Sequence, residues 1–195
     1  NESVRFVKTG CSAAKNKTGV KKQIKVLQIM PDNPCNGGNL NLQTDARFKK
    51  YYNSLNDYSI SITTMKVSEY QGYFSAANKF EFDYSKDVTY EGTALNPSKI
   101  SAEQSKLFDD YNMIIIGFDD MYGKTDLYND YGAVDFIKYF IAENKSVLFT
   151  HDLTSMNASK DGAGTWFGYS ANMLLRDTIG MNRYQAVSNR ISGDE

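Results

Sequence analysis

Cysteine and histidine are scarce in this sequence, and long apolar runs are absent. The 195 residues include two Cys and one His. Two cysteines, Cys11 and Cys35, are too few for the disulfide framework that holds many small secreted domains together. They form a single bridge in an oxidising compartment or remain separate thiols, and both alternatives stay open. No apolar run approaches the ~18 residues that a membrane-spanning helix needs, so we expect no insertion into a membrane.

Neither sign of charge predominates. The chain has 22 Lys+Arg against 23 Asp+Glu, a net charge of −1, which excludes a global attraction to nucleic acid. Basic residues gather near the amino terminus, at Lys8, Lys15, Lys17, Lys21, Lys22 and Lys25. A short basic run of this kind is usually a solvated tail, and contact with a polyanion is the alternative. The hydrophobic fraction of 41% is typical of a globular protein.

Apolar runs and helical periodicity alternate along the chain. Short runs rich in β-branched residues predict strands, and apolar side chains at a spacing of three to four residues predict helices. The predicted strands cover residues 24–30, 58–67, 111–118 and 145–151. The predicted helices cover 45–55, capped by Thr44, then 101–108, with a capping box of Ser101 and Gln104, and finally 133–144 and 170–180.

This order predicts a three-layer α/β fold of the flavodoxin-like kind, with a mostly parallel sheet and helices on both faces. We expect a polar arm at 1–22 and one α/β domain at 23–195, truncated at its carboxyl end. Residues 68–97 show no sustained period and are interpreted as an insert. Because the chain begins at Asn1 without Met, we expect a processed chain or a piece of a longer one.

Ligands of such sheets bind beyond the carboxyl ends of the strands. The loops that matter are therefore 31–41, 119–132 and 151–168. They carry the candidate ligand-binding residues Asp32, Asp119 and Asp120, and the candidate catalytic residues His151 and Asp152. Carboxylates with an imidazole can act as acid and base. Their spacing matches no metal signature, so neither a metal nor a cofactor is predicted. The alternative is that the aspartates cap the loops and helices that follow them.

Two further candidates lie at the same edge of the predicted sheet. Thr150 lies at the end of the last predicted strand, close to where receiver domains place a Thr or Ser after their fourth strand, but the long separation of Asp32 from Asp119 argues against that class. Trp166 lies in the glycine-rich stretch "DGAGTWFG" and is able to stack on a sugar or to anchor its loop to the core. Phosphate-loop, GxGxxG and GxSxG patterns are absent.

The stretch "YNMIIIGFDDMYG", the helix "AVDFIKYFIAEN" and the strand "KSVLFTHD" together resemble the class I glutamine amidotransferase-like superfamily. The resemblance covers roughly residues 24–184. It implies a sharp elbow after the strand at 145–151, where active members carry a nucleophilic Cys. Here His151 or a neighbour occupies that place, and no further histidine is available. Glutamine hydrolysis is therefore not expected.

"IKVLQIMPD", "TDARFKKYY" and "LLRDTIGMNRY" are similar to an uncharacterised family of large exported bacterial proteins. This resemblance implies a secreted or cell-surface setting, neighbouring domains of a longer chain, and an amidotransferase-like domain without the usual nucleophile. Members of the wider fold that lack the Cys include sugar-utilisation domains, which implies a glycan or another cell-surface component as the partner.

Three functions follow from these observations. The first is a non-catalytic module that binds carbohydrate or cell-surface material. The second is a hydrolase that uses His151 with Asp152 or Asp119, with or without the assistance of a metal ion. The third is a purely structural spacer, with the segment 68–97 as a docking surface.

Overall fold

The computed structural model describes residues 19–32, 40–83, 97–117 and 127–150, together with Leu175, Thr178 and Ile179. Strands and helices alternate in these ranges. The elements in chain order are β1 (Lys22–Met30), α1 (Ala46–Asn53), β2 (Tyr58–Lys66), α2 (Val67–Gln71), α3 (Ala102–Asp110), β3 (Met113–Ile116), α4 (Ala133–Ala142) and β4 (Ser146–Phe149).

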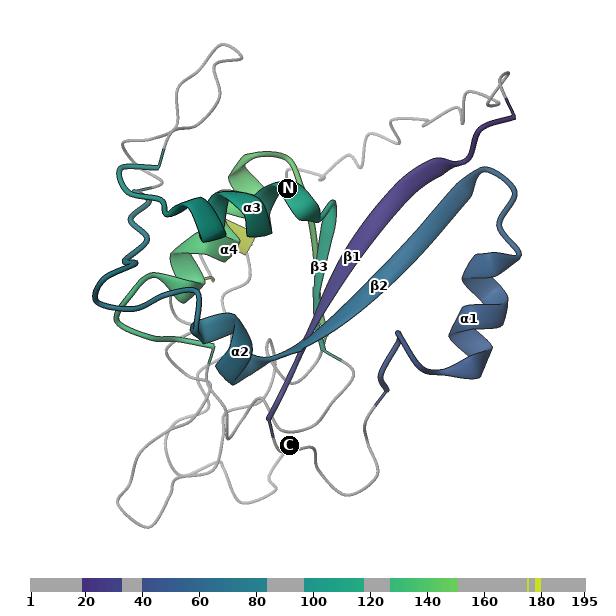
Figure 1. Ribbon diagram of the computed structural model, residues 1–195, viewed down its shortest axis with the longest axis horizontal. Coiled ribbons are helices and arrows are strands. Elements are labelled where there is room, and N and C mark those ends of the chain that lie inside the picture. Colours follow the sequence, from purple (N-terminus) through teal and green to yellow (C-terminus); the bar gives the residue numbers. More distant parts are fainter. Residues whose placement is uncertain are drawn as a thin grey trace, which may run out of the picture.

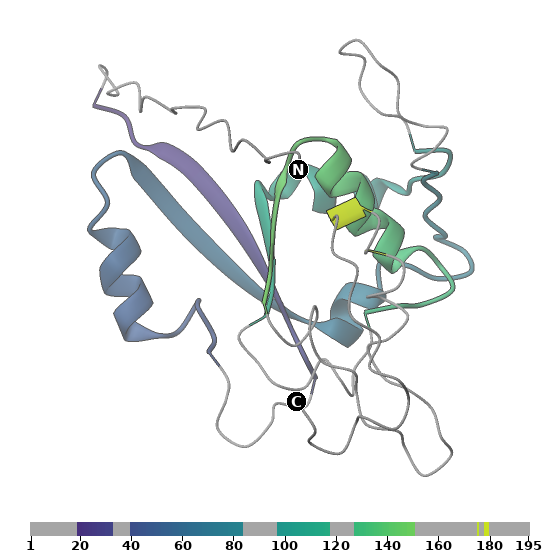
Figure 2. The ribbon, with the colours of Figure 1, turned by 180° about the vertical axis from the view of Figure 1, so that it is seen from behind.

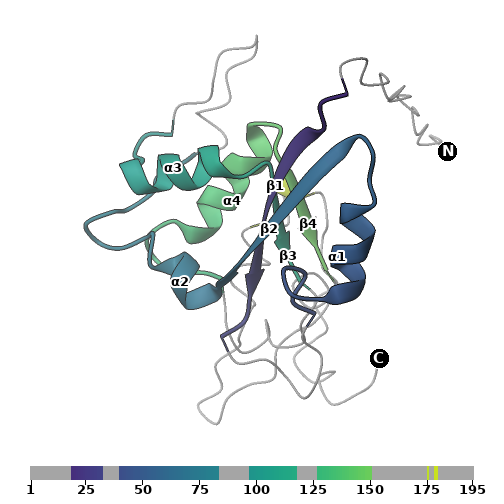
Figure 3. The same cartoon turned by 45° about the vertical axis from the view of Figure 1, so that its right-hand side comes forward.

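The four strands form one parallel sheet in the order β2-β1-β3-β4 (β1, β2 and β3 in Figure 1, all four strands in Figure 3). Val26 of β1 lies opposite Met113 of β3, and Met113 lies opposite Ser146 of β4. The predicted parallel alignment of the strands within 24–30, 111–118 and 145–151 is therefore confirmed, as is the α/β fold class. β3 is shorter than predicted, because its ladder to both neighbours spans only Met113–Ile116.

Helices cover both faces of the sheet. α1 lies on one face, and α2, α3 and α4 lie on the other (Figures 1 and 3). The apolar run of β1 serves both layers because successive side chains of a strand point to opposite faces. Leu27 and Ile29 belong to the large cluster under α4, whereas Val26 joins the smaller cluster on the face of α1.

Aromatic side chains from the segment interpreted as an insert complete the large cluster. Tyr70, Phe74, Phe80 and Phe82 are buried. The rings of Phe74 and Phe80 lie 5.5 Å and 5.4 Å, centroid to centroid, from the ring of Phe136 in α4. The described part of this segment thus forms core under the helices, because its rings fill the space between α2, α3 and α4.

Side-chain caps set the starts of two helices. The capping box predicted for α3 is confirmed, with Ser101 and Gln104 bonded to each other's backbone N–H groups. The cap of α1 is Asp45 and not Thr44, since the Asp45 carboxylate accepts from the N–H groups of Arg47 and Phe48. Thr44 instead closes the preceding turn by donating its N–H to Asn41.

β1 and β2 extend beyond β3 at their amino-terminal ends. The register places Val26 opposite Met113, so the four residues before Val26 in β1 have no strand partner in β3. Figure 2 shows the same two strands from behind, with their amino-terminal halves projecting away from the layer of α4. The predicted helix at 170–180 falls almost entirely outside the described residues. None of the helices in the described ranges is long and apolar enough to cross a membrane.

Candidate functional site

The carboxyl ends of the strands meet at one edge of the sheet. In chain order, β1 is followed by α1 on one face of the sheet, whereas β3 is followed by α4 on the other face. This divergence between neighbouring strands marks the switch point where α/β sheets bind ligands. Gly117 and Thr150 directly follow β3 and β4 at this edge, and Asp32 is the second residue after β1.

Asp32 is engaged within the fold. Its carboxylate accepts a hydrogen bond from the N–H of Ser68 at 3.1 Å and a second from the Ser68 hydroxyl. Beside it, the Lys66 ammonium donates to the carbonyl of Pro31 at 3.1 Å. These contacts fasten the end of β1 to the first turn of α2. The Asp32 carboxylate therefore helps to hold β1 and α2 together.

Thr150 closes the edge between β3 and β4. Its N–H donates to the carbonyl of Ile116 at 3.0 Å. Its side chain lies against Gly117, where a Cβ atom would overlap the Thr150 hydroxyl and methyl groups. This part of the edge is closely packed, and Gly117 makes the approach feasible because it has no side chain.

The remaining predicted site residues fall outside the described ranges. These are Asp119, Asp120, His151, Asp152 and Trp166. Cys11 and Cys35 also lie outside them. Among the residues that are described, no group of three or more His, Cys, Asp or Glu side chains is arranged to hold a metal ion.

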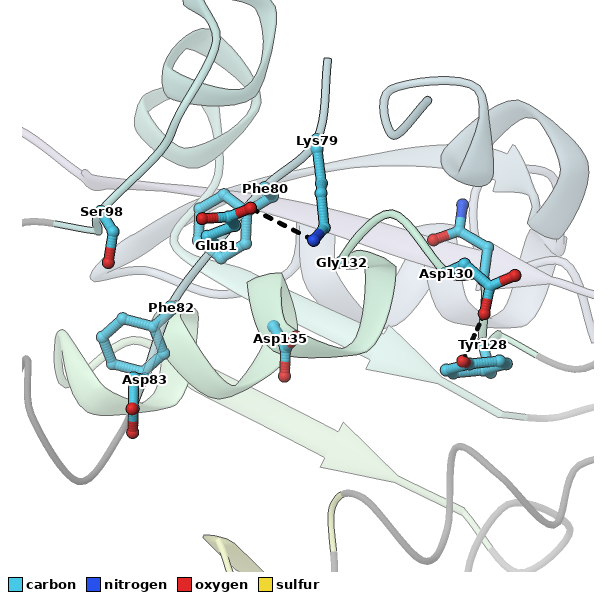
Figure 4. A pocket seen from close by; sticks show the side chains of 11 residues that line it. Lys79, Phe80, Glu81, Phe82, Asp83, Ser98, Tyr128, Asp130, Gly132 and Asp135 are labelled. Carbon is cyan, nitrogen blue, oxygen red and sulfur yellow. Dashed lines mark hydrogen bonds and ion pairs between the residues drawn. The ribbon is translucent and has the colours of Figure 1, made fainter. Parts of the chain in front are cut away.

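A cavity of about 450 Å³ opens beside the first turn of α4. Three segments far apart in the sequence line it: residues 79–83, Ser98, and residues 128–130 with Gly132 and Asp135 (Figure 4). The loop 119–132 is one of the predicted ligand-binding loops, but none of its residues after Asp120 is a predicted site residue, and residues 79–83 lie within the predicted insert. The cavity depends on the meeting of these segments, for which neither sequence pattern gives a signal.

The lining of this cavity is acidic and aromatic. The charged lining residues are four carboxylates and one lysine: Glu81, Asp83, Asp130, Asp135 and Lys79. The aromatic lining residues are Phe80, Phe82 and Tyr128. Tyr128 is 38% exposed, and its hydroxyl donates to Asp130 at 2.6 Å. Lys79 pairs with Glu81 at 3.1 Å. The cavity therefore offers several anionic hydrogen-bond acceptors next to an accessible ring.

Hydrogen bonds between the Asn129 side chain and the backbone, and the close approach of Gly132 to Phe80, hold the cavity wall in place. The Asn129 side chain donates to the Phe74 carbonyl at 3.2 Å and accepts from the N–H groups of Tyr131 and Ala133. Gly132 adopts a φ of 96°, and a Cβ there would strike the carbonyl of Phe80. A glycine is needed because L side chains disfavour this φ and because the two segments approach so closely.

The first turn of α4 also rests on a buried tyrosine. The Tyr70 hydroxyl donates to the carbonyl of Ala133 at 2.7 Å. Burial raises the pKa of this phenol well above its ordinary value, and the carboxylate of Asp135 raises it further. Tyr70 therefore keeps its proton even in alkaline solution, and its hydroxyl donates the hydrogen bond that positions α4 beneath the cavity.

Comparison with known proteins adds no relative: no family model, no curated protein and no solved structure matches this chain.

Proposed function

We propose that this chain is a non-catalytic module that binds carbohydrate or other cell-surface material in the cavity beside α4. One observation carries the proposal. A cavity of about 450 Å³ combines carboxylates with the exposed ring of Tyr128 in a single wall. Its size falls within the range of small-molecule sites, which is about 300–1,000 Å³.

The lining suits the chemistry of sugars. A sugar presents many hydroxyl donors, and ionised carboxylates are pure acceptors with two oxygens each. A sugar ring also has an apolar face, which packs on aromatic rings as other apolar groups do. Asp130 and Tyr128 lie beside each other and supply one group of each kind. A charge-assisted hydrogen bond from a hydroxyl to Asp130 would fix the orientation of the ligand.

The proposal is tested by titrating the chain with a panel of cell-wall oligosaccharides, followed by NMR and calorimetry. Replacement of the aromatic wall, Tyr128→Ala, should lower the affinity at least ~5-fold, which corresponds to about 1 kcal/mol. The matched control is Tyr131→Ala, because Tyr131 is equally exposed but does not line the cavity. Equal loss in both variants, or no binding of any glycan at millimolar concentration, contradicts the proposal.

The setting belongs to the same proposal. We infer an exported bacterial protein with neighbouring domains, and a class I glutamine amidotransferase-like domain without a nucleophilic Cys, from the sequence resemblance alone. The absence of a nearby cysteine in the stretch 145–157 supports a binding role over amide hydrolysis.

A hydrolase is the second candidate. Ile116 of β3 and Phe149 of β4 lie opposite each other, and Thr150 bonds to Ile116. The segments that carry Asp119 and His151 therefore depart from adjacent points of the sheet edge. If the chain hydrolyses a glycan, His151→Ala should abolish turnover while leaving the unfolding midpoint unchanged. Binding that survives in His151→Ala, with no turnover in the unaltered protein, favours the module.

A further inference from the structure

The backbone groups of β2 alternate between the two sides of the strand. Lys22 donates its N–H to the carbonyl of Asp57 at 2.9 Å, and Lys22 is the register partner of Tyr58. In a parallel pair with this register, the odd-numbered residues of β2 direct their N–H and C=O groups toward β1. The even-numbered residues therefore direct theirs outward, to the open edge of the sheet.

Side chains of the same chain close one half of this edge. The Gln43 amide oxygen accepts from the N–H of Thr64 at 3.1 Å, and the Glu69 carboxylate accepts from the N–H of Lys66 at 2.7 Å. At the amino-terminal half, residues 58–62, no hydrogen bond reaches the outward backbone groups from any described residue. The strand thus has a closed half and an open half.

The open half lacks the usual protection of edge strands. Exposed edges are commonly blunted by charged side chains or proline, and β2 has neither between Tyr58 and Met65. The nearest lysines belong to the neighbouring β1 (Lys22 and Lys25) or precede it (Lys21), so they do not lie on the edge strand itself. Figure 1 shows this end of β1 and β2 projecting beyond α2, α3 and α4, so that these three helices do not obstruct the edge. α1 is the helix beside this end, and its Phe48 packs on the face of β2 that carries Ile60 and Ile62.

We propose that a second copy of this chain pairs with β2 through residues 58–62, antiparallel, with the two-fold axis beside Ile60. In this register, Ile60 lies opposite Ile60 of the second copy, and Tyr58 lies opposite Ile62. All three residues direct their backbone groups outward, so each pair exchanges two hydrogen bonds. The segment is self-complementary, as a two-fold interface requires.

The side chains support this pairing. Ile60 and Ile62 pack in the smaller core cluster on the α1 face, and Tyr58 shares their face because side chains alternate along a strand. Tyr58 is 41% exposed. In the dimer its ring covers Ile62 of the second copy, a favourable aromatic–aliphatic cross-strand pair. The two four-stranded sheets become one continuous sheet. The contact is small, so a weak dimer is expected.

Sedimentation of the whole chain, from about 10 µM to about 1 mM, tests the association expected for such a small interface. The variant Ser61→Lys places an ammonium group on an exposed side chain of the open half. Like charges in close cross-strand positions destabilise pairing, so the dissociation constant should rise at least ~10-fold. Asn53→Lys is the matched control, because it adds the same charge to an exposed site on α1. A monomer at every concentration, or an equal effect of both variants, overturns the proposal.

A second variant tests the register. In the proposed register, Ser59 of one copy lies opposite Ser61 of the other. The two residues form a non-hydrogen-bonded pair with Cα atoms about 4.5 Å apart, a distance that suits a disulfide. The double variant Ser59→Cys/Ser61→Cys, made in a Cys11→Ser/Cys35→Ser background, should yield a covalent dimer on mild oxidation. Ser59→Cys alone should yield far less. Equal cross-linking of both overturns the register.

Hydrogen exchange distinguishes the other occupants of this edge. The amides of Tyr58, Ile60 and Ile62 should exchange rapidly in dilute protein and become protected as the dimer forms. Protection that is already complete in the dilute monomer means that the chain covers its own edge, and this outcome also overturns the proposal. Protection that appears only with an added partner peptide, without self-association, identifies an extended peptide as the occupant instead.

Discussion

Asp32 and Ser68 are joined by two hydrogen bonds that link the end of β1 to the first turn of α2, 36 residues further along the chain. Both donors of Ser68, its N–H and its hydroxyl, are directed at the same carboxylate. Of the aspartates predicted to gather at the sheet edge, Asp32 is the one that the structure describes, and it holds two elements together.

Replacing Asp32 by Ala should therefore reduce stability. Removal of hydrogen bonds to a charged group lowers the free energy of unfolding by about 1.5–3 kcal/mol, measured by urea denaturation. Asp57→Ala is the control, since Asp57 is exposed at the turn before β2. An Asp32→Ala protein with unaltered stability would show that the contact to Ser68 contributes little.

Gln28→Leu should destabilise the layer of α1. Gln28 is fully buried, and its amide donates to the carbonyl of Leu40 and accepts from the N–H of Leu42, both at 2.8 Å. The substitution leaves two backbone groups without partners, and each buried unsatisfied group costs about 1–3 kcal/mol. Urea unfolding checks this against Gln23→Leu on the exposed part of the same strand. Similar midpoints for the two variants would contradict the expectation.

Gly117→Ala should strain the junction of β3 and β4. The added methyl group would overlap the Thr150 side chain, and overpacking of this kind costs about 1–3 kcal/mol. The cost should shrink when the same substitution is made in a Thr150→Gly background, because the obstructing atoms are gone. A thermal double-mutant cycle measures the coupling. A coupling of zero would mean that the strain comes from elsewhere.

The contribution of Tyr70 should depend on pH. Its folded-state pKa is raised by burial and by Asp135, so its stabilising effect is complete below the unfolded-state pKa of about 10. Above that value the unfolded chain loses the phenol proton while the folded chain retains it, and stability falls. The difference in unfolding free energy between the unaltered protein and Tyr70→Phe should be about 1 kcal/mol at pH 7. It should decrease above pH 10. A difference that is constant up to pH 11 would contradict this assignment.

The elements with strong local signals were predictable. The capping box of α3 and the apolar face of α4 depend on side chains three to four residues apart, which a sequence displays directly. The predicted Thr44 cap of α1 was wrong, because Thr44 and Asp45 are both good caps and the turn that bonds Thr44 to Asn41 leaves Asp45 as the cap. The aromatic stretch around Tyr70 and Phe80 has no period, so its place in the core could not be read from its pattern.

The site depends on contacts between distant segments. The apolar strands and amphipathic helices determined the parallel sheet and its two covered faces, because burial of those side chains leaves few other arrangements. Only the tertiary structure decided that residues 79–83 meet the first turn of α4 around a cavity, and that Asp32 binds Ser68. It also decided that the outer edge of β2 is open at residues 58–62. These relations join residues tens of positions apart, and no local preference of the chain specifies such distances.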